Sequence, residues 1–176
     1  MNNKIKLLDG SMSFPLEKKG YNLHDKLWTG KALINDPDLI KNIHKGYIEA
    51  GADYISTATY QISFNRLEEM EYHPAEIKEI FQKSVDLVKE AILESNSKKE
   101  IKIVGSFGPY ASFDPEASEY VGEYNVSDNT IMNFHLNNIR VIEETDLDIL
   151  LYETIPCLSC LLYTSPSPRD LSTSRM

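Results

Sequence analysis

Two carboxylates follow short, largely apolar runs near opposite ends of the chain, and they are the side chains best placed to do chemistry. Asp9 follows the run at residues 5–8, and Glu153 follows the run at residues 149–152. Short apolar runs are typical of strands that are buried on both faces of a parallel sheet. Folds of this kind assemble their sites at the carboxyl ends of the strands, so we expect the two carboxylates to face one cationic group.

A third set of polar side chains closes another predicted strand. Small and β-branched residues at 52–61 predict a strand whose last residues are Thr59, Tyr60 and Gln61. These side chains would lie at the same edge of the sheet as the two carboxylates. They could line a pocket there or serve as ordinary loop contacts.

Helical periodicity alternates with the predicted strands. An apolar stripe predicts a helix that is capped by Asp36, begins at Pro37 and is closed by Gly51. Further helices are predicted at 75–93 and, capped by Ser127, at 127–142, and strands at 5–8, 52–61, 101–110 (with an exit turn) and 149–152. This β-α-β-α-β-α-β order predicts an α/β fold with a parallel sheet and right-handed crossovers. A (β/α)8 TIM barrel has roughly 250 residues, so the first four βα units of such a barrel, a half barrel, are expected.

Composition narrows the class of protein. The chain has 176 residues, of which 41% are hydrophobic, and a formal net charge of −9. This acidity argues against nucleic acid or an anionic membrane surface as a partner. No stretch approaches the roughly 20 apolar residues of a membrane span, and the amino terminus leads directly into a predicted strand. We therefore expect a cytoplasmic protein without a signal peptide.

The end of the chain differs in composition from the rest. Residues 160–176 are rich in Ser, Thr and Pro and show no periodicity, and they resemble translated sequencing adapter. We expect residues 1–159 to form the folded unit and 160–176 to be a non-native, disordered tail. The C-x-x-C pair Cys157 and Cys160 could indicate redox or metal chemistry, but its second cysteine falls in this tail.

Five short motifs stand in order at the predicted strand ends. They are Leu8-Asp9-Gly10-Ser11, Ala50-Gly51-Ala52-Asp53, Thr57-Ala58-Thr59-Tyr60-Gln61, Gly105-Ser106-Phe107-Gly108-Pro109-Tyr110 and Glu153-Thr154-Ile155-Pro156-Cys157. In this order they resemble the homocysteine S-methyltransferase family of (β/α)8 barrels, over about residues 5–159. The resemblance implies that this chain is the amino-terminal half of such a barrel.

The resemblance implies a site for homocysteine. Asp9 and Glu153 would hold the substrate ammonium, and backbone N–H groups around Gly10 and Ser11 would suit its carboxylate. The remaining expected substrate-binding residues are Thr59, Tyr60 and Gln61. One departure from the family pattern is Ser11, which stands where a second glycine is usual.

The family chemistry also implies a metal and a second substrate. In this family, three cysteine thiolates bind Zn2+, which lowers the pKa of the homocysteine thiol, and the thiolate takes a methyl group from S-methylmethionine or S-adenosylmethionine to give methionine. The zinc cysteines are expected beyond the end of this chain, and Cys157 matches a non-ligand position. We therefore expect no metal ligand in this fragment and no activity from it alone.

Other interpretations remain open. The two carboxylates could be structural, or could hold Mg2+ in a different barrel enzyme such as a lyase. The chain could also be a non-catalytic fragment.

Segment 12–31 predicts a loop over the site with a helical turn at 16–20, in which Trp28 could cover the pocket or pack in the core. The four histidines (His24, His44, His73 and His135) show no ligand spacing and are expected on the surface or on helices. Unpaired sheet edges in a half barrel also predict self-association.

Overall fold

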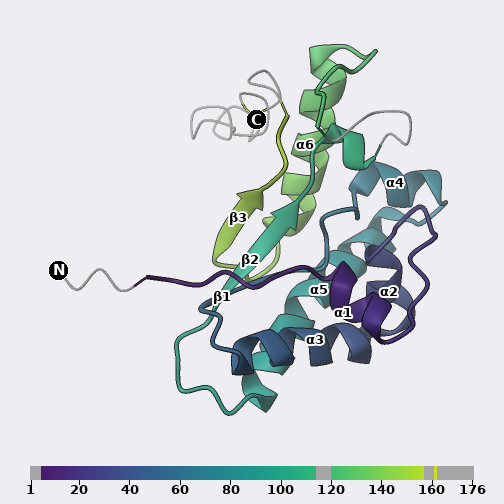
Figure 1. Cartoon of the computed structure of the whole chain (residues 1–176). Coiled ribbons are helices and arrows are strands. Elements are labelled where there is room, and N and C mark those ends of the chain that lie inside the picture. Colours follow the sequence, from purple (N-terminus) through teal and green to yellow (C-terminus); the bar gives the residue numbers. More distant parts are fainter. Residues whose placement is uncertain (1–4, 114–119, 157–160, 162–176) are drawn as a thin grey trace.

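A three-stranded parallel sheet organises the molecule (Figure 1). The computed structural model describes residues 5–113, 120–156 and 161. The strands lie in the order β1-β2-β3 and comprise Tyr54–Ser56, Lys102–Phe107 and Ile149–Tyr152. The predicted α/β fold with a parallel sheet is confirmed.

Helices connect the strands and follow the predicted alternation. The helices that were predicted are α3 (Pro37–Glu49), α5 (Pro74–Glu94) and α6 (Asp128–Ile142). The short elements are α1 (Ser13–Lys18), α2 (Gly30–Asn35), α4 (Phe64–Glu69) and the 3-10 turn η1 (Tyr110–Ser112). The helical turn expected at 16–20 corresponds to α1, whereas α2 and α4 were not predicted. Both are six residues long, which is too short for a helical period to stand out from sequence.

The ends of the long helices are set by the residues that the sequence indicated. The Asp36 side chain accepts a hydrogen bond from the Leu39 backbone N–H at 3.3 Å, and Pro37 occupies the first helical position of α3. Gly51 follows α3 with a φ of 107°, a left-handed conformation that favours glycine. The Ser127 hydroxyl caps α6 by accepting the Thr130 backbone N–H at 3.2 Å.

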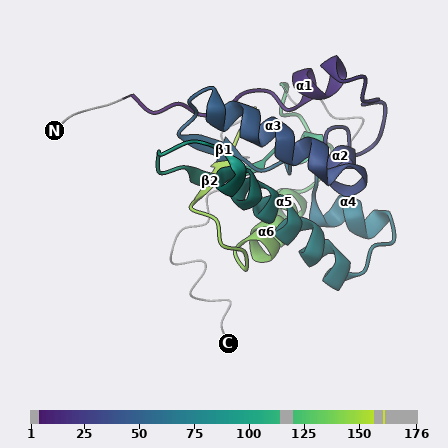
Figure 2. The ribbon, with the colours of Figure 1, turned by 90° about the horizontal axis from the view of Figure 1, so that it is seen from below.

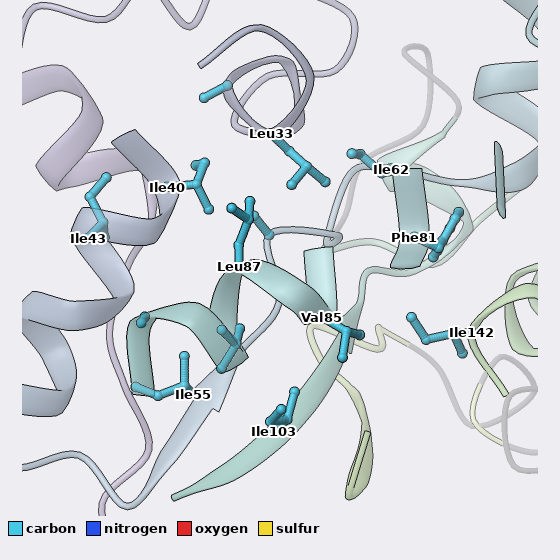
Figure 3. Packing of buried hydrophobic residues seen from close by; sticks show 14 of the residues in the cluster. Leu33, Ile40, Ile43, Ile55, Ile62, Phe81, Val85, Leu87, Ile103 and Ile142 are labelled. Carbon is cyan, nitrogen blue, oxygen red and sulfur yellow. The ribbon is translucent and has the colours of Figure 1, made fainter. Parts of the chain in front are cut away.

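The core lies between the sheet and the long helices. Helix α5 contacts α3, α6 and β2, so it is the central helix of the layer (Figure 2). Phe81 and Val85 of α5 lie in one cluster with Ile55 of β1, Ile103 of β2 and Ile142 of α6 (Figure 3). Burying one such side chain contributes about 1.5–3 kcal/mol, and this cluster therefore holds the strands in register.

The two outer segments of the sheet differ from the prediction. The run at 5–8 forms a single parallel bridge, from Leu8 to Tyr54, rather than a strand. Its side chains are exposed, and in β3 Ile149 and Leu150 are each 40% exposed. The expectation of strands buried on both faces is therefore wrong for these runs. The run at 5–8 and strand β3 lie at the two edges of the described sheet, and each has a neighbouring strand on one side only. Their side chains therefore lack neighbours on the open side among the described residues.

The second predicted strand is shorter than expected. Strand β1 ends at Ser56, and Thr59, Tyr60 and Gln61 lie in the turn that follows. The four histidines lie on the surface or in helices, as expected. His24 and His73 are exposed, whereas His44 in α3 and His135 in α6 are buried, and neither ring nitrogen of either one has a hydrogen-bond partner among the described residues.

Some predictions fall on residues that the structure does not describe. Cys157, Cys160 and the predicted tail at 160–176, apart from Leu161, lie outside the described residues. None of the helices in the described part of the chain has the length and apolar character that spanning a bilayer requires.

Candidate functional site

A cavity of about 420 Å³ opens at the carboxyl ends of the strands. Its walls come from segments that are distant in sequence: the loop after the Leu8 bridge, the loop before α2, the end of β1, β2 and the residues after β3. The lining residues are Leu8, Asp9, Gly10, Ser11, Met12, Ser13, Trp28, Thr29, Ser56, Thr57, Ala58, Tyr60, Ser106, Glu153 and Thr154. The parallel sheet therefore brings Asp9 and Glu153 into one cavity.

Asp9 is held by the end of β1. Its backbone N–H donates to the Tyr54 carbonyl at 3.0 Å, which continues the pairing beyond the Leu8 bridge. Its carboxylate accepts two hydrogen bonds from Ser56, one from the backbone N–H and one from the hydroxyl, both at 2.9 Å. The side chain is thereby fixed at the cavity wall.

Glu153 is held by β2 from the other side. Its backbone N–H donates to the Phe107 carbonyl at 3.1 Å, which extends the pairing of β3 with β2 by one residue. The Ser106 hydroxyl donates a short hydrogen bond to the carboxylate oxygen Oε1. No hydrogen bond to the other oxygen, Oε2, is formed within the described residues, so this oxygen can accept one from a ligand.

The electrostatics of the cavity favour a positively charged ligand. Burial raises the pKa of Asp9 to about 6, the two hydrogen bonds from Ser56 oppose this shift, and the negative charge of Glu153 adds to it. Among the described residues, no lysine or arginine forms an ion pair with either carboxylate. The cavity therefore carries negative charge that no cationic side chain in the described part of the chain neutralises.

The loop after Asp9 passes close to the Tyr47 side chain at Gly10. A Cβ on Gly10 would lie 3.0 Å from the Tyr47 hydroxyl oxygen and 3.1 Å from its ring, which is tighter than ordinary packing. The Tyr47 hydroxyl donates to the Ser11 carbonyl at 2.8 Å and so holds this loop against α3. The Ser11 hydroxyl contacts that of Ser13 at 2.8 Å at the start of α1. Gly10 and Ser11 both line the cavity, as expected for residues of the site.

The three polar residues after β1 separate in the structure. Tyr60 lines the cavity, whereas Thr59 and Gln61 do not. Thr59 is fully buried, and its hydroxyl donates to the Ser106 carbonyl at 2.7 Å. Thr59 and Gln61 therefore lie outside the lining of this cavity. The chain turns after Ser56, and the Thr59 hydroxyl is directed into the sheet.

Several lining residues were not identified from sequence. Ser56 and Ser106 lie in two of the strands, and the only sequence signal was that they stand near predicted strand ends. Trp28, which was expected either to cover the pocket or to pack in the core, lines the cavity, as does Thr154. The two residues have positive φ angles of 46° and 58°, which are unfavourable for such side chains. Strain of this kind is concentrated at functional sites, and both residues line this cavity.

The described residues do not supply a set of metal ligands. Within 5–113, 120–156 and 161, no group of three or more His, Cys, Asp or Glu side chains is arranged to hold a metal ion. Asp9 and Glu153 are the two carboxylates among the residues that line the cavity.

Comparison with known protein families gives a match over most of the chain. The model of the family described as homocysteine S-methyltransferase matches residues 6–163. The chain is 39% identical over 160 residues to the homocysteine S-methyltransferase YbgG of Bacillus subtilis, covering 87% of this chain and 51% of the relative. It is 35% identical to the homocysteine S-methyltransferase of Escherichia coli, covering 88% of this chain and 51% of that protein. It is also 34% identical to a selenocysteine Se-methyltransferase of Brassica oleracea, with 85% and 47% covered.

Solved structures show the same relationship. The metallated form of the homocysteine methyltransferase MmuM from Escherichia coli superposes with a TM-score of 0.84 at 31% identity, covering 98% of this chain and 61% of that one. The oxidized form gives a TM-score of 0.85 at 32% identity, covering 98% and 59%. The chain thus spans about half the length of the curated relatives that it matches.

Proposed function

Because the chain belongs to the homocysteine S-methyltransferase family, we propose that its cavity binds the amino-acid end of homocysteine for methyl transfer to the thiol. The observation that carries this proposal is the pair of carboxylates in one cavity, Asp9 and Glu153, without a cationic partner among the described residues. The activity belongs to the longer relatives, of which this chain spans about half.

An ammonium group fits the charge of this cavity. Asp9, with a pKa of about 6, is mostly ionised at neutral pH, and the charge of Glu153 makes that ionised form less favourable. An ammonium placed between the two carboxylates would relieve this repulsion and donate up to three hydrogen bonds. Binding of the amino acid would therefore lower the pKa of Asp9 below its value in the free protein.

The wider reaction follows from the family. The homocysteine thiolate would attack the methyl group of a sulfonium donor, S-methylmethionine or S-adenosylmethionine, and the donor would leave as a neutral thioether. The C–S bond to the donor breaks as the bond to homocysteine forms, and the product is methionine. We place this reaction in cytoplasmic methionine biosynthesis, and we propose that residues 1–159 form four βα units of a (β/α)8 barrel.

A zinc ion is part of the same proposal, but it requires ligands from elsewhere. The described residues do not fit a zinc site, because no suitable group of three donor side chains is present among them. One of the similar solved structures is of a metallated form, which supports a metal in the longer relatives. The roles assigned to this chain are therefore to bind and orient homocysteine, and we expect the 176 residues alone to bind it without turning it over.

Titration of the purified chain with L-homocysteine, followed by NMR, tests the proposal. We expect Asp9→Asn and Glu153→Gln each to weaken binding by about tenfold or more, since each loses a charge-assisted hydrogen bond to the ammonium. Asp148→Asn is a matched control, because Asp148 lies at the opposite end of β3. Equal affinity of the wild-type chain and the two cavity variants would contradict the proposal.

A further inference from the structure

Each carboxylate in the cavity is paired with a serine from a neighbouring strand. Ser56 ends β1 and donates to Asp9 through both its hydroxyl and its backbone N–H. Ser106 lies in β2 and donates its hydroxyl to Glu153. The two pairs are equivalent in the sheet: in each, a serine near the end of one strand holds a carboxylate that follows the adjacent parallel segment.

The second serine is itself held on both sides. The Ser106 backbone N–H donates to the Thr57 hydroxyl oxygen at 3.1 Å, and its carbonyl accepts from the Thr59 hydroxyl at 2.7 Å. The Thr57 and Thr59 hydroxyl oxygens are 2.7 Å apart, and because the Thr59 proton goes to Ser106, Thr57 donates to Thr59. All three residues are buried, so this chain of hydrogen bonds holds the backbone of Ser106 in place.

We propose that Ser56 and Ser106 are positioning residues, which orient Asp9 and Glu153 so that their free lone pairs point at the substrate ammonium. This inference rests on the proposed function. An ionised carboxylate only accepts hydrogen bonds, so each serine hydroxyl must spend its one proton on the carboxylate and cannot donate it to the ligand. The serines therefore act through the carboxylates and make no contact with the reacting sulfur.

A neutral donor suits this purpose better than a cation would. A lysine or arginine at either serine position would orient the carboxylate but would also neutralise it, and the cavity would lose its preference for a positive ligand. A serine hydroxyl fixes the geometry and leaves the charge in place. Glu153 Oε2, which has no hydrogen bond within the described residues, is the oxygen left to the ligand when Ser106 occupies Oε1.

The experiment compares two ligands that differ only in the amino group. L-homocysteine and its deaminated analogue, γ-mercaptobutyrate, are titrated by NMR into the 176-residue chain and into Ser56→Ala, Ser106→Ala and Ser84→Ala variants. We expect the two site variants to lose about tenfold in affinity for homocysteine and none for the analogue. Ser84→Ala is the matched control, because Ser84 is a buried serine whose hydroxyl donates to the Phe81 carbonyl at 2.7 Å in α5.

A pH profile gives a readout that a merely structural role would not change. The Ser56 hydroxyl lowers the pKa of Asp9, so Ser56→Ala should move the midpoint of homocysteine affinity above its wild-type value near pH 6. Ser56→Thr keeps the hydroxyl and should restore the wild-type midpoint. If Ser106→Ala fails to fold, Ser106→Cys keeps the side-chain size with a weaker donor and should show an intermediate loss.

The outcomes separate the two proposals. A wild-type chain that binds both ligands equally would refute ammonium recognition, and with it the proposed function. A wild-type chain that prefers homocysteine, with serine variants that keep that preference and the pH midpoint, would overturn only the role of the serines. An equal loss of both ligands in the serine variants would also overturn it, because it would show a general structural effect.

Discussion

The two ends of the sheet carry the same type of side chain in opposite electrostatic settings. At the amino ends of the strands, Asp53 precedes β1 and Asp148 precedes β3, and at the carboxyl ends Asp9 and Glu153 face the cavity. The pKa is lowered for both aspartates at the amino end and raised for Asp9 at the carboxyl end.

The difference arises from the partners. At the amino end, Asp148 accepts the Ile103 backbone N–H at 2.8 Å and a hydrogen bond from the Lys102 ammonium at 3.0 Å. Asp53 likewise accepts the Leu7 backbone N–H at 3.0 Å, and two further lysines lie close to it. These hydrogen bonds and charges favour the ionised form. At the carboxyl end the partners are neutral serines, so the positive charge is left for a ligand to supply.

The largest expected effect of pH on stability comes from neither end of the sheet but from two buried histidines in helices. Burial lowers the pKa of His44 and of His135 to about 4, below an unfolded value of 6.5. The neutral form is favoured on folding, so this stability is complete above about pH 6.5 and is lost as pH falls towards 4. The loss should be about 3 kcal/mol per histidine.

Denaturant unfolding at pH 7 and pH 4 measures this loss. His44→Leu and His135→Leu should each remove their share of the acid destabilisation, and the exposed His24→Leu should change nothing. If the Leu variants lose as much stability between the two pH values as the wild type does, the assignment is wrong.

Asp9→Asn is expected to have the next largest effect on stability. The direction of this effect is opposite to that expected for the aspartates at the amino end of the sheet. The pKa of Asp9 is raised to about 6 from 3.8, so its contribution to stability is present below about pH 3.8 and is lost as pH rises through 6. A neutral amide avoids that loss, and the variant should be more stable than the wild type by about 1–3 kcal/mol at pH 7. The gain should vanish near pH 4, as measured by the difference between the two chains at each pH. If the variant is less stable than the wild type at pH 7, the proposed difference between the two ends of the sheet is wrong.

Sequence patterns predicted the features that depend on local order. Asp36 and Ser127 cap their helices as expected, and the rule that parallel strands share a carboxyl edge brought Asp9 and Glu153 together across more than a hundred residues. Both predictions needed only the type and order of the helices and strands, which can be recognised from strong periodicity in the sequence.

The features that the sequence did not predict depend on where each strand ends and on which side of a strand has neighbouring segments. Thr59 was expected at the cavity, but β1 ends at Ser56 and the following turn directs Thr59 into the sheet. Ser106 was part of a recognised motif but was not assigned to the site, because a small residue beside a glycine in a strand gives no sign of which face it occupies. The exposure of Leu150 follows from the edge position of β3, which the strand order determines and a single run of residues does not.

Relieving the backbone strain at Thr154 is expected to have a smaller effect on stability. Thr154, which follows Glu153 and lines the cavity, has a φ of 58°, a conformation that costs a side chain roughly 1–2 kcal/mol. Thr154→Gly should stabilise the fold by about 1 kcal/mol and weaken homocysteine binding, since Glu153 would be held less firmly. Glu71→Gly is the control: its φ is 65°, it lies outside the cavity lining, and it should gain stability with no change in binding. If both variants bind homocysteine as the wild type does, the strain at Thr154 has no role in the site.

The smallest expected effect is Asp148→Asn, at the amino end. The pKa of Asp148 is lowered, first by the Ile103 backbone hydrogen bond and then by Lys102, so its stability is present above the unfolded value near 3.8 and is lost as pH falls through the lower folded value. The side chain is 35% exposed, and solvent screens the ion pair, so the variant should lose no more than about 1 kcal/mol at pH 7. Calorimetry at pH 7 should show a slightly lower unfolding temperature with unchanged homocysteine affinity, which is the opposite of Asp9→Asn on both counts. If instead the substitution stabilised the fold or weakened homocysteine binding, the division between a stabilising end and a binding end would not hold.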